Sequence, residues 1–557
     1  MMHRSMPVGV DDFKELVENY YLVDKTDFIR QIIDGHSKVT LITRPRRFGK
    51  TLTMSMLDYF FSLEKRAETE HLFDGLAIDQ AGVQYMSHRG ESPTVFVTLR
   101  GVKQESFADM LGDFRAIVGD LFAKHASVLP GTVLRQAEAE YFQRVVDYKA
   151  DKLDLERSLL KLCEFLSRAY GKPVILLIDE YDVPIQHGWE CGYYNEGIAF
   201  MKNFLGNALK GNPYLDFAVI TGVLRVGKES IFSDLNNLEA CSVFINIYSD
   251  VFGFTYDEVA QMAQDLGCPE QLPVIKSWYD GYHFGDSEIY NPWSVINFFR
   301  QKNTPRAYWR NTSSNSLLQE MLPEAGEKRL DELRLLLEGG TVWTQINDRV
   351  VYDDIRRDDL ALYTLLLTTG YLTVKTEELD GDDIIYELRI PNREVRSAYS
   401  AEILSRIGTG VGQKDFTDMR RHLLHGEAEK FANELQIILI GIVSVYDTAS
   451  KESFYHGLML GLVATLIGQD RYTVESNRES GHGRFDIALV PRDVANPGVV
   501  MEFKVADKLE AMKTRAQEAL QQIEKKKYTA GLKAAGVKDV WCYGVAFYGK
   551  DVYIARK

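Results

Sequence analysis

Apolar runs alternate with amphipathic stretches along the first half of the chain. Four of these runs are short, rich in β-branched residues and typical of buried parallel strands: Val39–Ile42, Thr94–Leu99, Pro173–Ile178 and Phe217–Thr221. Helical periodicity marks the stretches between them: Thr51–Tyr59, Ser106–His125, Ala137–Tyr148 and Leu153–Tyr170. Strands that alternate with helices predict an α/β fold, and we expect a doubly wound parallel sheet within a domain over residues 1–250.

The pattern becomes helical after residue 250. We expect a small helical lid over residues 251–340 and a connector over residues 341–445. In the connector, an apolar helix at Leu360–Gly370 precedes strands at Tyr371–Lys375 and Ile384–Ile390, an order that resembles a winged helix. Winged helices can bind DNA, but the expected hairpin tip, Glu377–Asp383, is almost wholly acidic. A connecting role is therefore favoured.

The last segment, residues 446–557, returns to mixed periodicity. We expect helices at Phe454–Ile467 and Asp507–Lys527, and strands at Tyr472–Ser476, Arg484–Val490, Val499–Val505 and Val540–Tyr548. This order predicts a second, smaller α/β domain.

Composition narrows the class of protein. At 557 residues, with 45% hydrophobic and 26% charged residues, the chain indicates three or four globular domains. Its five cysteines form no C-x-x-C pair, which favours a reducing compartment over a zinc site or a disulfide framework. The longest apolar runs are too short to span a bilayer, and the N-terminus lacks a signal-peptide core. We expect a soluble, cytoplasmic protein that does not bind membranes.

Charge is distributed unevenly. The whole chain carries a net charge of −15, which opposes binding to nucleic acid. Residues 446–557 contain 17 Lys and Arg against 14 Asp and Glu, a net of +3, so the rest carries −18. If any segment contacts DNA or RNA, we expect it to be this one.

The turn after the first strand contains the closing half of a phosphate-binding loop, Gly49-Lys50-Thr51. In such loops backbone N–H groups cradle the phosphates, Lys reaches the β and γ oxygens, and the Thr hydroxyl ligates Mg²⁺. The common pattern would place Gly where this chain has Arg44. The turn also contains Arg46 and Arg47, and we count all three arginines among the candidate nucleotide contacts. The alternative is a basic strand-to-helix turn without a ligand.

A second motif makes the nucleotide site the favoured interpretation. The strand Pro173–Ile178 ends in Asp179-Glu180. An Asp at the end of a central strand can hold Mg²⁺ through water, and the adjacent Glu can polarise the attacking water. A carboxylate pair in this position can also be a helix cap. Thr221, at the end of the next strand, could sense the γ-phosphate. Arg225 could reach a phosphate in its own subunit or in a neighbouring one, so a homo-oligomer stays open.

Three residues of the C-terminal segment form a candidate metal site. Glu502 and Lys504 share a face of one strand, and a hairpin can bring Asp486 beside them. Two carboxylates offer oxygen ligands to Mg²⁺, or to Mn²⁺, and the lysine can stabilise charge that develops on a phosphorus. The alternative is an edge strand with a solvent-facing Glu/Lys ladder.

The N-terminal half resembles the bacterial AAA-ATPase-like family, whose phosphate loop reads RPRRFGKT. The matching segments are Val23–Thr26, Arg44–Thr51, Leu177–Asp182 and Thr221–Asn237. Arg44 is normal within this family. The resemblance implies a P-loop nucleoside triphosphatase that binds ATP and Mg²⁺.

The C-terminal segment resembles the PD-(D/E)XK nuclease superfamily through Phe454–Gly457, Ser480–Asp486, Glu502–Lys504 and Ala519–Ile523. The last of these places Gln522 in the candidate catalytic set with Asp486, Glu502 and Lys504. The resemblance implies an ATP-regulated, metal-dependent nuclease that acts on nucleic acid, with DNA favoured, in defence or in the processing of mobile elements. The alternative is a non-catalytic, ATP-switched binding protein or sensor whose nuclease fold recognises nucleic acid or a partner without cutting it.

Overall fold

The computed structural model describes residues 5–129, 133–225, 232, 237–309, 332, 335–336, 339–346, 359–381, 383–397, 413–442, 455, 459, 462–463, 472–476, 479–480 and 483–557. The chain divides into two compact units, which are described separately. The first unit comprises Met1–Tyr308 and Thr341–Asn392, and the second comprises Trp309–Gly340 and Arg393–Lys557. The division into four domains made from the sequence stays a prediction.

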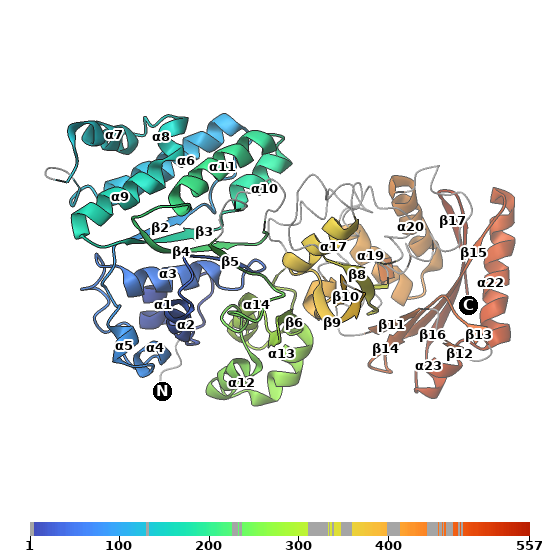
Figure 1. Ribbon diagram of the computed structural model, residues 1–557. Coiled ribbons are helices and arrows are strands. Elements are labelled where there is room, and N and C mark those ends of the chain that lie inside the picture. The colour runs from blue at the N-terminus through green and yellow to red at the C-terminus, as the bar shows by residue number, and fades with distance from the viewer. Residues whose placement is uncertain are drawn as a thin grey trace. The chain divides into compact units, whose positions relative to one another are not determined.

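The first unit contains a five-stranded sheet in the order β2-β3-β4-β1-β5, with every neighbouring pair parallel. The strands are β1 (Val39–Thr43), β2 (Thr94–Thr98), β3 (Val174–Asp179), β4 (Leu215–Gly222) and β5 (Leu238–Cys241). Helices cover both faces of the sheet (Figure 1). One face carries α1 (Phe13–Asn19), α2 (Asp27–Gly35) and α3 (Lys50–Phe61), with α4 (Ala77–Gln80) and α5 (Val83–Met86) beyond them. The other carries α6 (Phe107–Lys124), α7 (Gln136–Val146), α8 (Lys152–Glu156), α9 (Ser158–Tyr170), α10 (Val183–Glu190) and α11 (Tyr194–Leu209).

This architecture confirms the doubly wound sheet. Every residue of β1 and β3 is buried, because helices cover both faces and continuous apolar runs can fill both sides. The strand order places β4 between β1 and β3, so the carboxyl ends of these three strands meet at one edge of the sheet.

A helical lid follows the sheet, as predicted. It consists of α12 (Tyr256–Asp265), a 3₁₀ turn η1 (Pro269–Gln271), α13 (Leu272–Tyr279), the hairpin β6 (Tyr282–Phe284) and β7 (Ser287–Ile289), and α14 (Pro292–Arg300). Thr255 begins α12 with a capping box to Glu258, and Asn291 caps α14 ahead of its first-turn proline. Aromatic residues of this segment form a buried core, among them Trp278, Tyr279, Tyr290 and Phe298.

A second sheet in this unit has the order β8-β10-β9 and is entirely antiparallel. Its strands are β8 (Val342–Gln345), β9 (Thr373–Asp380) and β10 (Asp383–Arg389), and α17 (Asp359–Thr368) precedes β9. The helix-strand-strand order of the winged-helix-like connector is present. The expected acidic tip is wrong in one respect: Glu377, Glu378 and Asp380 lie along β9, and the turn itself centres on Gly381.

The second unit contains a mixed sheet in the order β11-β14-β15-β16-β17, in which only β15 and β16 are parallel. Its elements are α19 (Gln413–Leu424), α20 (Ala428–Ile442), β11 (Tyr472–Ser476), β12 (Glu479–Ser480), β13 (Gly483–Arg484), β14 (Ile487–Pro491), β15 (Gly498–Val505), η4 (Leu509–Ala511), α22 (Met512–Lys526), α23 (Ala530–Ala534), β16 (Val540–Tyr548) and β17 (Asp551–Arg556).

The two faces of this sheet carry different helices. Met501 and Phe503 of β15 pack with α19 and α20 in one apolar core, whereas Val500 packs with α22 in another. Since side chains alternate along a strand, Glu502 and Lys504 lie on the α22 side. A Cβ on Gly544 would come 2.1 Å from the carbonyl oxygen of Ala516 in α22. Gly544 is also the register partner of Glu502, so the missing side chain lets α22 approach the strand beside this carboxylate.

The structure corrects several expected elements. The single helix at Leu153–Tyr170 is two helices, α8 and α9, that meet at Arg157. A loop is also expected after Asp179-Glu180, but Pro184 occupies the first turn of α10, where its missing N–H costs nothing. The expected strand Arg484–Val490 is interrupted at Phe485–Asp486, which separates β13 from β14. The expected helix at Phe454–Ile467 lies largely outside the described residues, as does the turn at Gly481-His482. Over the ranges given above, no helix is both long and apolar enough to cross a bilayer.

Candidate nucleotide and nuclease sites

The turn between β1 and α3 has the backbone form of a phosphate loop. Arg47 (φ 69°) and Gly49 (φ 85°) adopt left-handed conformations, which turn successive N–H groups toward one side of the chain. Lys50, the first residue of α3, is buried, and its Nζ donates to the carbonyl oxygens of Arg44 (3.0 Å) and Pro45 (2.8 Å). The loop therefore closes around its own ammonium group, which is the group expected to meet phosphate oxygens.

Three hydroxyl groups surround the carboxylate of Asp179 at the end of β3. Thr51 Oγ1 donates to Oδ2 (2.8 Å), Thr221 Oγ1 donates to Oδ1 (2.6 Å), and Thr98 Oγ1 at the end of β2 donates to Oδ2 (3.2 Å). Three of these four residues were chosen from the sequence, and the strand order brings them together because β4 lies between β1 and β3. Thr98 was missed; the signal was a polar residue at the end of a buried strand.

Glu180 follows in a left-handed conformation (φ 54°), which is uncommon for a residue with a side chain. Its N–H donates to Thr221 Oγ1 (3.3 Å). Burial raises the pKa of the Glu180 carboxyl, and the charge of Lys50 opposes that rise. Burial likewise lowers the pKa of Lys50, against the attraction of Glu180, Asp182 and Asp179. The negative charges of Glu180, Asp182 and Asp179 therefore all favour the charged form of the Lys50 ammonium.

The arginines of the loop point in different directions. Arg44 is fully buried, and its guanidinium donates to the carbonyl oxygens of Thr43, Cys241 and Tyr248 and lies 5.0 Å from the Phe284 ring centroid. This arrangement ties the loop to β5 and the lid. Burial lowers the pKa of Arg44 to about 10.

Arg46 donates to the side chain of Gln186 on α10 (3.1 Å). Arg47 contacts the lid: its Cζ lies 4.2 Å from the Trp293 ring centroid, and its Nη1 donates to the carbonyl oxygen of Tyr308 (3.1 Å). Arg225 lies three residues beyond β4 and is half-buried. The charge of Arg46 acts on both Lys50 and Glu180.

Asp182 is a further buried carboxylate that the sequence reasoning did not single out. Its Oδ2 accepts hydrogen bonds from the N–H groups of Val223 (2.8 Å) and Leu224 (2.9 Å). Burial raises the pKa of this carboxyl, and the two N–H donors oppose the rise. The available signal was a third acidic residue two positions after the Asp179-Glu180 pair.

In the second unit, the interruption between β13 and β14 places Asp486 beside β15. Its Oδ2 accepts a hydrogen bond from the N–H of Phe503 (2.7 Å), the residue between Glu502 and Lys504. Lys504 Nζ lies 3.4 Å from Glu502 Oε1. The structure thus brings together the three residues chosen from the sequence, with Glu502 only 3% exposed.

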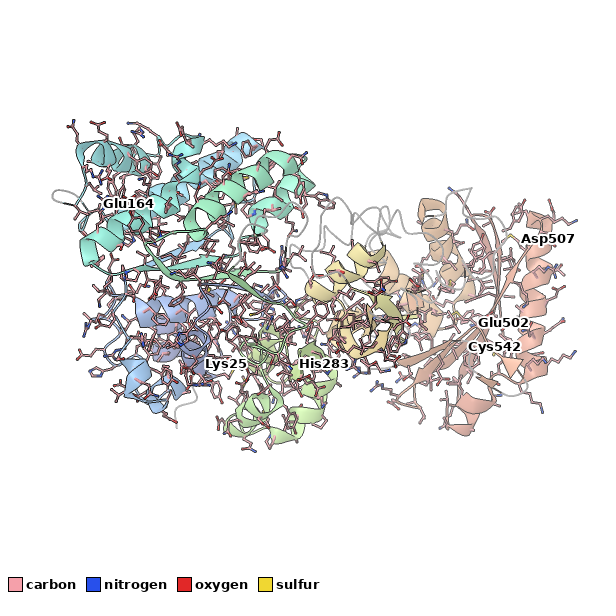
Figure 2. All side chains as sticks on the ribbon, in the orientation of Figure 1. Lys25, Glu164, His283, Glu502, Asp507 and Cys542 are labelled. Atoms are coloured by element: carbon pink, nitrogen blue, oxygen red, sulfur yellow. The ribbon has the colours of Figure 1, made fainter. Side chains whose placement is uncertain are left out.

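Gln522 completes this cluster from α22, which lies against the sheet beside Glu502 (Figure 2). Its side-chain amide donates to Glu502 Oε1 and approaches the hydroxyl of Tyr528 (3.4 Å). Gln517 and Gln521 on the same helix are exposed to solvent, whereas Gln522 lies on the face of the helix that contacts Glu502. Tyr528, a buried residue just beyond α22, was missed.

The donor sets fit the groups that the sequence motifs imply. Thr51 and Asp179 offer a hydroxyl and a carboxylate beside a buried ammonium, a combination suited to Mg²⁺ and a nucleoside triphosphate. Asp486, just before β14, and Glu502 on β15 offer two carboxylates, and Lys504 lies beside Glu502; this set suits a hard divalent cation and a phosphodiester.

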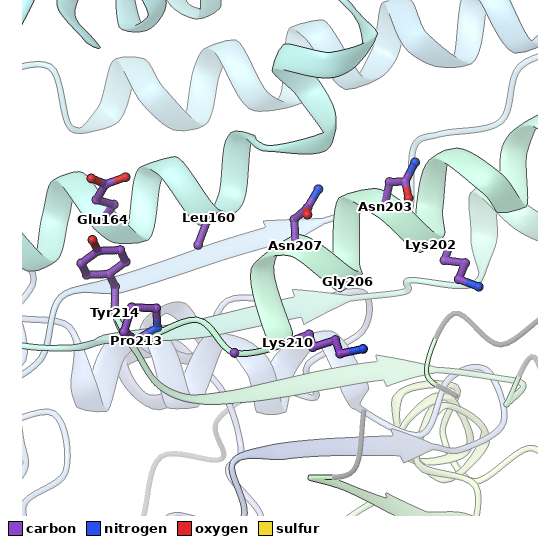
Figure 3. Close-up of a pocket in the computed structure, with 10 residues that line it drawn as sticks. Leu160, Glu164, Lys202, Asn203, Gly206, Asn207, Lys210, Pro213 and Tyr214 are labelled. Atoms are coloured by element: carbon purple, nitrogen blue, oxygen red, sulfur yellow. The ribbon is translucent and has the colours of Figure 1, made fainter. Parts of the chain in front are cut away.

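A separate hollow of about 430 Å³ lies between α9, α11 and the turn into β4 (Figure 3). Its lining includes Tyr214, at the opposite end of β4 from Thr221. The hollow is therefore not part of the phosphate site.

Comparisons with known proteins match two regions of the chain, and each region contains one of the candidate sites. Residues 7–232 match a family model described as "Predicted AAA-ATPase", and residues 450–557 match the model of the PD-(D/E)XK nuclease superfamily. The chain is also similar to a protein of Azotobacter chroococcum mcd 1 described as an uncharacterized protein in the vnfD 5' region. The two are 27% identical over 568 residues, which cover 98% of this chain and 97% of that protein. The chain therefore combines an AAA-ATPase-like domain with a PD-(D/E)XK nuclease-superfamily domain.

Proposed function

We propose that this protein binds and hydrolyses ATP in its first unit and uses a divalent cation in its second unit to cleave nucleic acid, with ATP controlling the cleavage. One observation carries the proposal: in both units, polar residues from different elements of the fold come together beside a sheet. Lys50, Thr51, Asp179 and Thr221 converge in the first unit, and Asp486, Glu502, Lys504 and Gln522 converge in the second.

In the nucleotide site, the loop N–H groups and Lys50 would bind the β- and γ-phosphates of ATP. Mg²⁺ held by Thr51 and, through water, Asp179 would neutralise charge on the phosphates. Glu180 would orient the attacking water and accept its proton, a role that its partly buried carboxyl and raised pKa favour. Thr221 would keep Asp179 and the backbone of Glu180 in register, because its hydroxyl bonds to both.

In the second site, Asp486 and Glu502 would hold Mg²⁺ or Mn²⁺, which would polarise the scissile phosphate and make a bound water more acidic. Lys504 would stabilise the charge that develops on the phosphate oxygens. Gln522 would fix the orientation of Glu502, and Tyr528 would in turn support Gln522.

DNA is the proposed substrate. Three consecutive lysines, Lys525–Lys527, end α22 next to Tyr528, and two of them are exposed. They would meet a phosphate backbone close to Gln522 and Glu502. A role in defence or in processing mobile DNA is proposed by analogy with related domain combinations.

We expect Glu180→Gln to slow ATP hydrolysis by about 10²-fold while the Kd for ATP changes by less than about threefold. The amide keeps the size of the side chain but cannot accept the proton. Steady-state hydrolysis and calorimetric titration measure the two quantities. Glu164→Gln, at the remote hollow, is the matched control and should leave both unchanged. Equal loss of binding and turnover would contradict the assigned role.

The nuclease assignment is tested by incubating the full chain with Mg²⁺ or Mn²⁺ and a panel of single- and double-stranded DNA and RNA, with and without ATP. Cleavage that requires the metal supports the proposal. Tight binding of nucleic acid without cleavage under every condition would instead support a non-catalytic recognition domain.

A further inference from the structure

The residues that follow Asp179-Glu180 bind directly to the end of the neighbouring strand. The N–H of Tyr181 donates to the carbonyl oxygen of Thr221 (3.0 Å), and the Tyr181 hydroxyl donates to the carbonyl oxygen of Leu224 (2.7 Å). Asp182 accepts from the N–H groups of both Val223 and Leu224. Four hydrogen bonds therefore connect Tyr181 and Asp182 to three of the four residues Thr221–Leu224.

This contact has little freedom to change. Tyr181 and Asp182 are both buried, and a Cβ on Gly222 would lie 2.7 Å from the Tyr181 ring and 2.9 Å from Asp182 Oδ1. A side chain at position 222 would push the two segments apart. One carboxylate oxygen that accepts two successive N–H groups also fixes the direction of the backbone after β4.

Arg225 directly follows this fixed turn, which comprises Thr221–Leu224. Thr221 is the first residue of the turn, and its hydroxyl donates a hydrogen bond to Asp179. The position of the arginine relative to Asp179 and Glu180 is thus set by Asp182, through the backbone of Val223 and Leu224.

We infer that Asp182 is a positioning residue for ATP hydrolysis: it holds the turn after β4 so that Arg225 meets the γ-phosphate. The inference rests on the proposed ATPase function and adds to it a residue that does not touch the nucleotide. A misplacement of about 1 Å at a charged group can lower a rate by about 10²-fold, so a large effect on turnover is expected.

The test compares kcat for ATP, and the Kd for a non-hydrolysable ATP analogue, in the full chain and its variants. Asp182→Ala should lower kcat by about 30- to 100-fold and change the Kd by less than about threefold. Asp182→Asn keeps an acceptor oxygen and should retain kcat within about threefold of wild type. Combining Asp182→Ala with Arg225→Ala should be no slower than Arg225→Ala alone, since both act through one guanidinium.

Asp58→Ala is the control, because it removes another buried carboxylate, one bonded to Lys65, from a different part of the unit. It should leave kcat unchanged. Tyr181→Phe removes only a hydroxyl and keeps the inference testable if the alanine variant does not fold. A loss of about fivefold in kcat, absent in the Arg225→Ala background, is expected.

Two results would overturn the inference: wild-type kcat in Asp182→Ala or Tyr181→Phe, or losses that multiply with that of Arg225→Ala. Failure of the wild-type chain to bind the analogue would instead overturn the proposed ATPase function, and this inference with it.

Discussion

Lys50→Ala should weaken ATP binding by about 10²-fold, equivalent to ~2.7 kcal/mol. The ammonium is buried and donates hydrogen bonds to two carbonyl oxygens of its own loop, from which it can turn toward phosphate. Removing it takes away the charge that meets the β and γ oxygens. Isothermal titration with ATP and Mg²⁺ gives the Kd directly.

The matched control is Lys38→Ala. Lys38 lies just before β1, at the opposite edge of the same sheet, and bonds to the carbonyl oxygen of Leu215. It should bind ATP like the wild type. Lys50→Gln separates charge from loop geometry, because the amide can still donate to the loop carbonyls. Wild-type affinity in either Lys50 variant would contradict the assigned nucleotide site.

Asp486→Ala and Glu502→Gln should each lower metal-dependent cleavage by at least about 10³-fold without unfolding the second unit. Each removes one of the two carboxylates of the candidate metal site, and neither belongs to an apolar core. Lys504→Ala should reduce the rate with little change in metal affinity. Cleavage assays with Mn²⁺ titrations distinguish these effects.

Asp493→Asn serves as the control for these variants, because Asp493 is an exposed carboxylate in the turn between β14 and β15. It should cleave like the wild type. Equal Mn²⁺ binding by wild type and Asp486→Ala, with no cleavage by either, would favour the non-catalytic alternative.

Sequence patterns predicted the strands that carry the nucleotide site because those strands are buried on both faces. Continuous apolar runs such as Pro173–Ile178 have no other good explanation between amphipathic helices. Short or half-exposed elements were harder: β5 and β17 were missed, and β13–β14 was expected to be one strand. Local pattern does not show that the chain bends at Asp486, and this bend is what brings the carboxylate to the N–H of Phe503.

The site residues divide in the same way. Lys50, Thr51 and Asp179 follow from spacing along the chain. Thr98 and Asp182 depend on strand order and on bonds to backbone N–H groups, which no spacing rule contains. Arg44 shows that a pattern can also suggest a contact too readily. As a basic residue in a phosphate loop it was expected near the nucleotide, but its guanidinium donates to the backbone carbonyls of Cys241 in β5 and of Tyr248.

The phosphate loop also packs against the lid, which suggests a route by which nucleotide could alter the rest of the first unit. The ring of Phe48 lies 5.0 Å from that of Tyr282 and 5.2 Å from that of Phe284 in the lid hairpin. Arg47 stacks on Trp293 of α14. A change in loop conformation on binding ATP would therefore change contacts with the lid. We propose this as the first step in ATP control, which requires different ATP affinities in the two arrangements.

The most direct measurement of ATP control is DNA cleavage across an ATP titration, at fixed Mn²⁺ or Mg²⁺, by wild type, Lys50→Ala and Glu180→Gln. ATP should change the cleavage rate of wild type and Glu180→Gln by about fivefold or more, and should leave Lys50→Ala unchanged. By reciprocity of binding, DNA should change the ATP affinity of the wild type by the same factor by which ATP changes its DNA affinity. Identical cleavage by all three proteins at every ATP concentration would contradict an ATP-controlled nuclease and show that the two domains act independently.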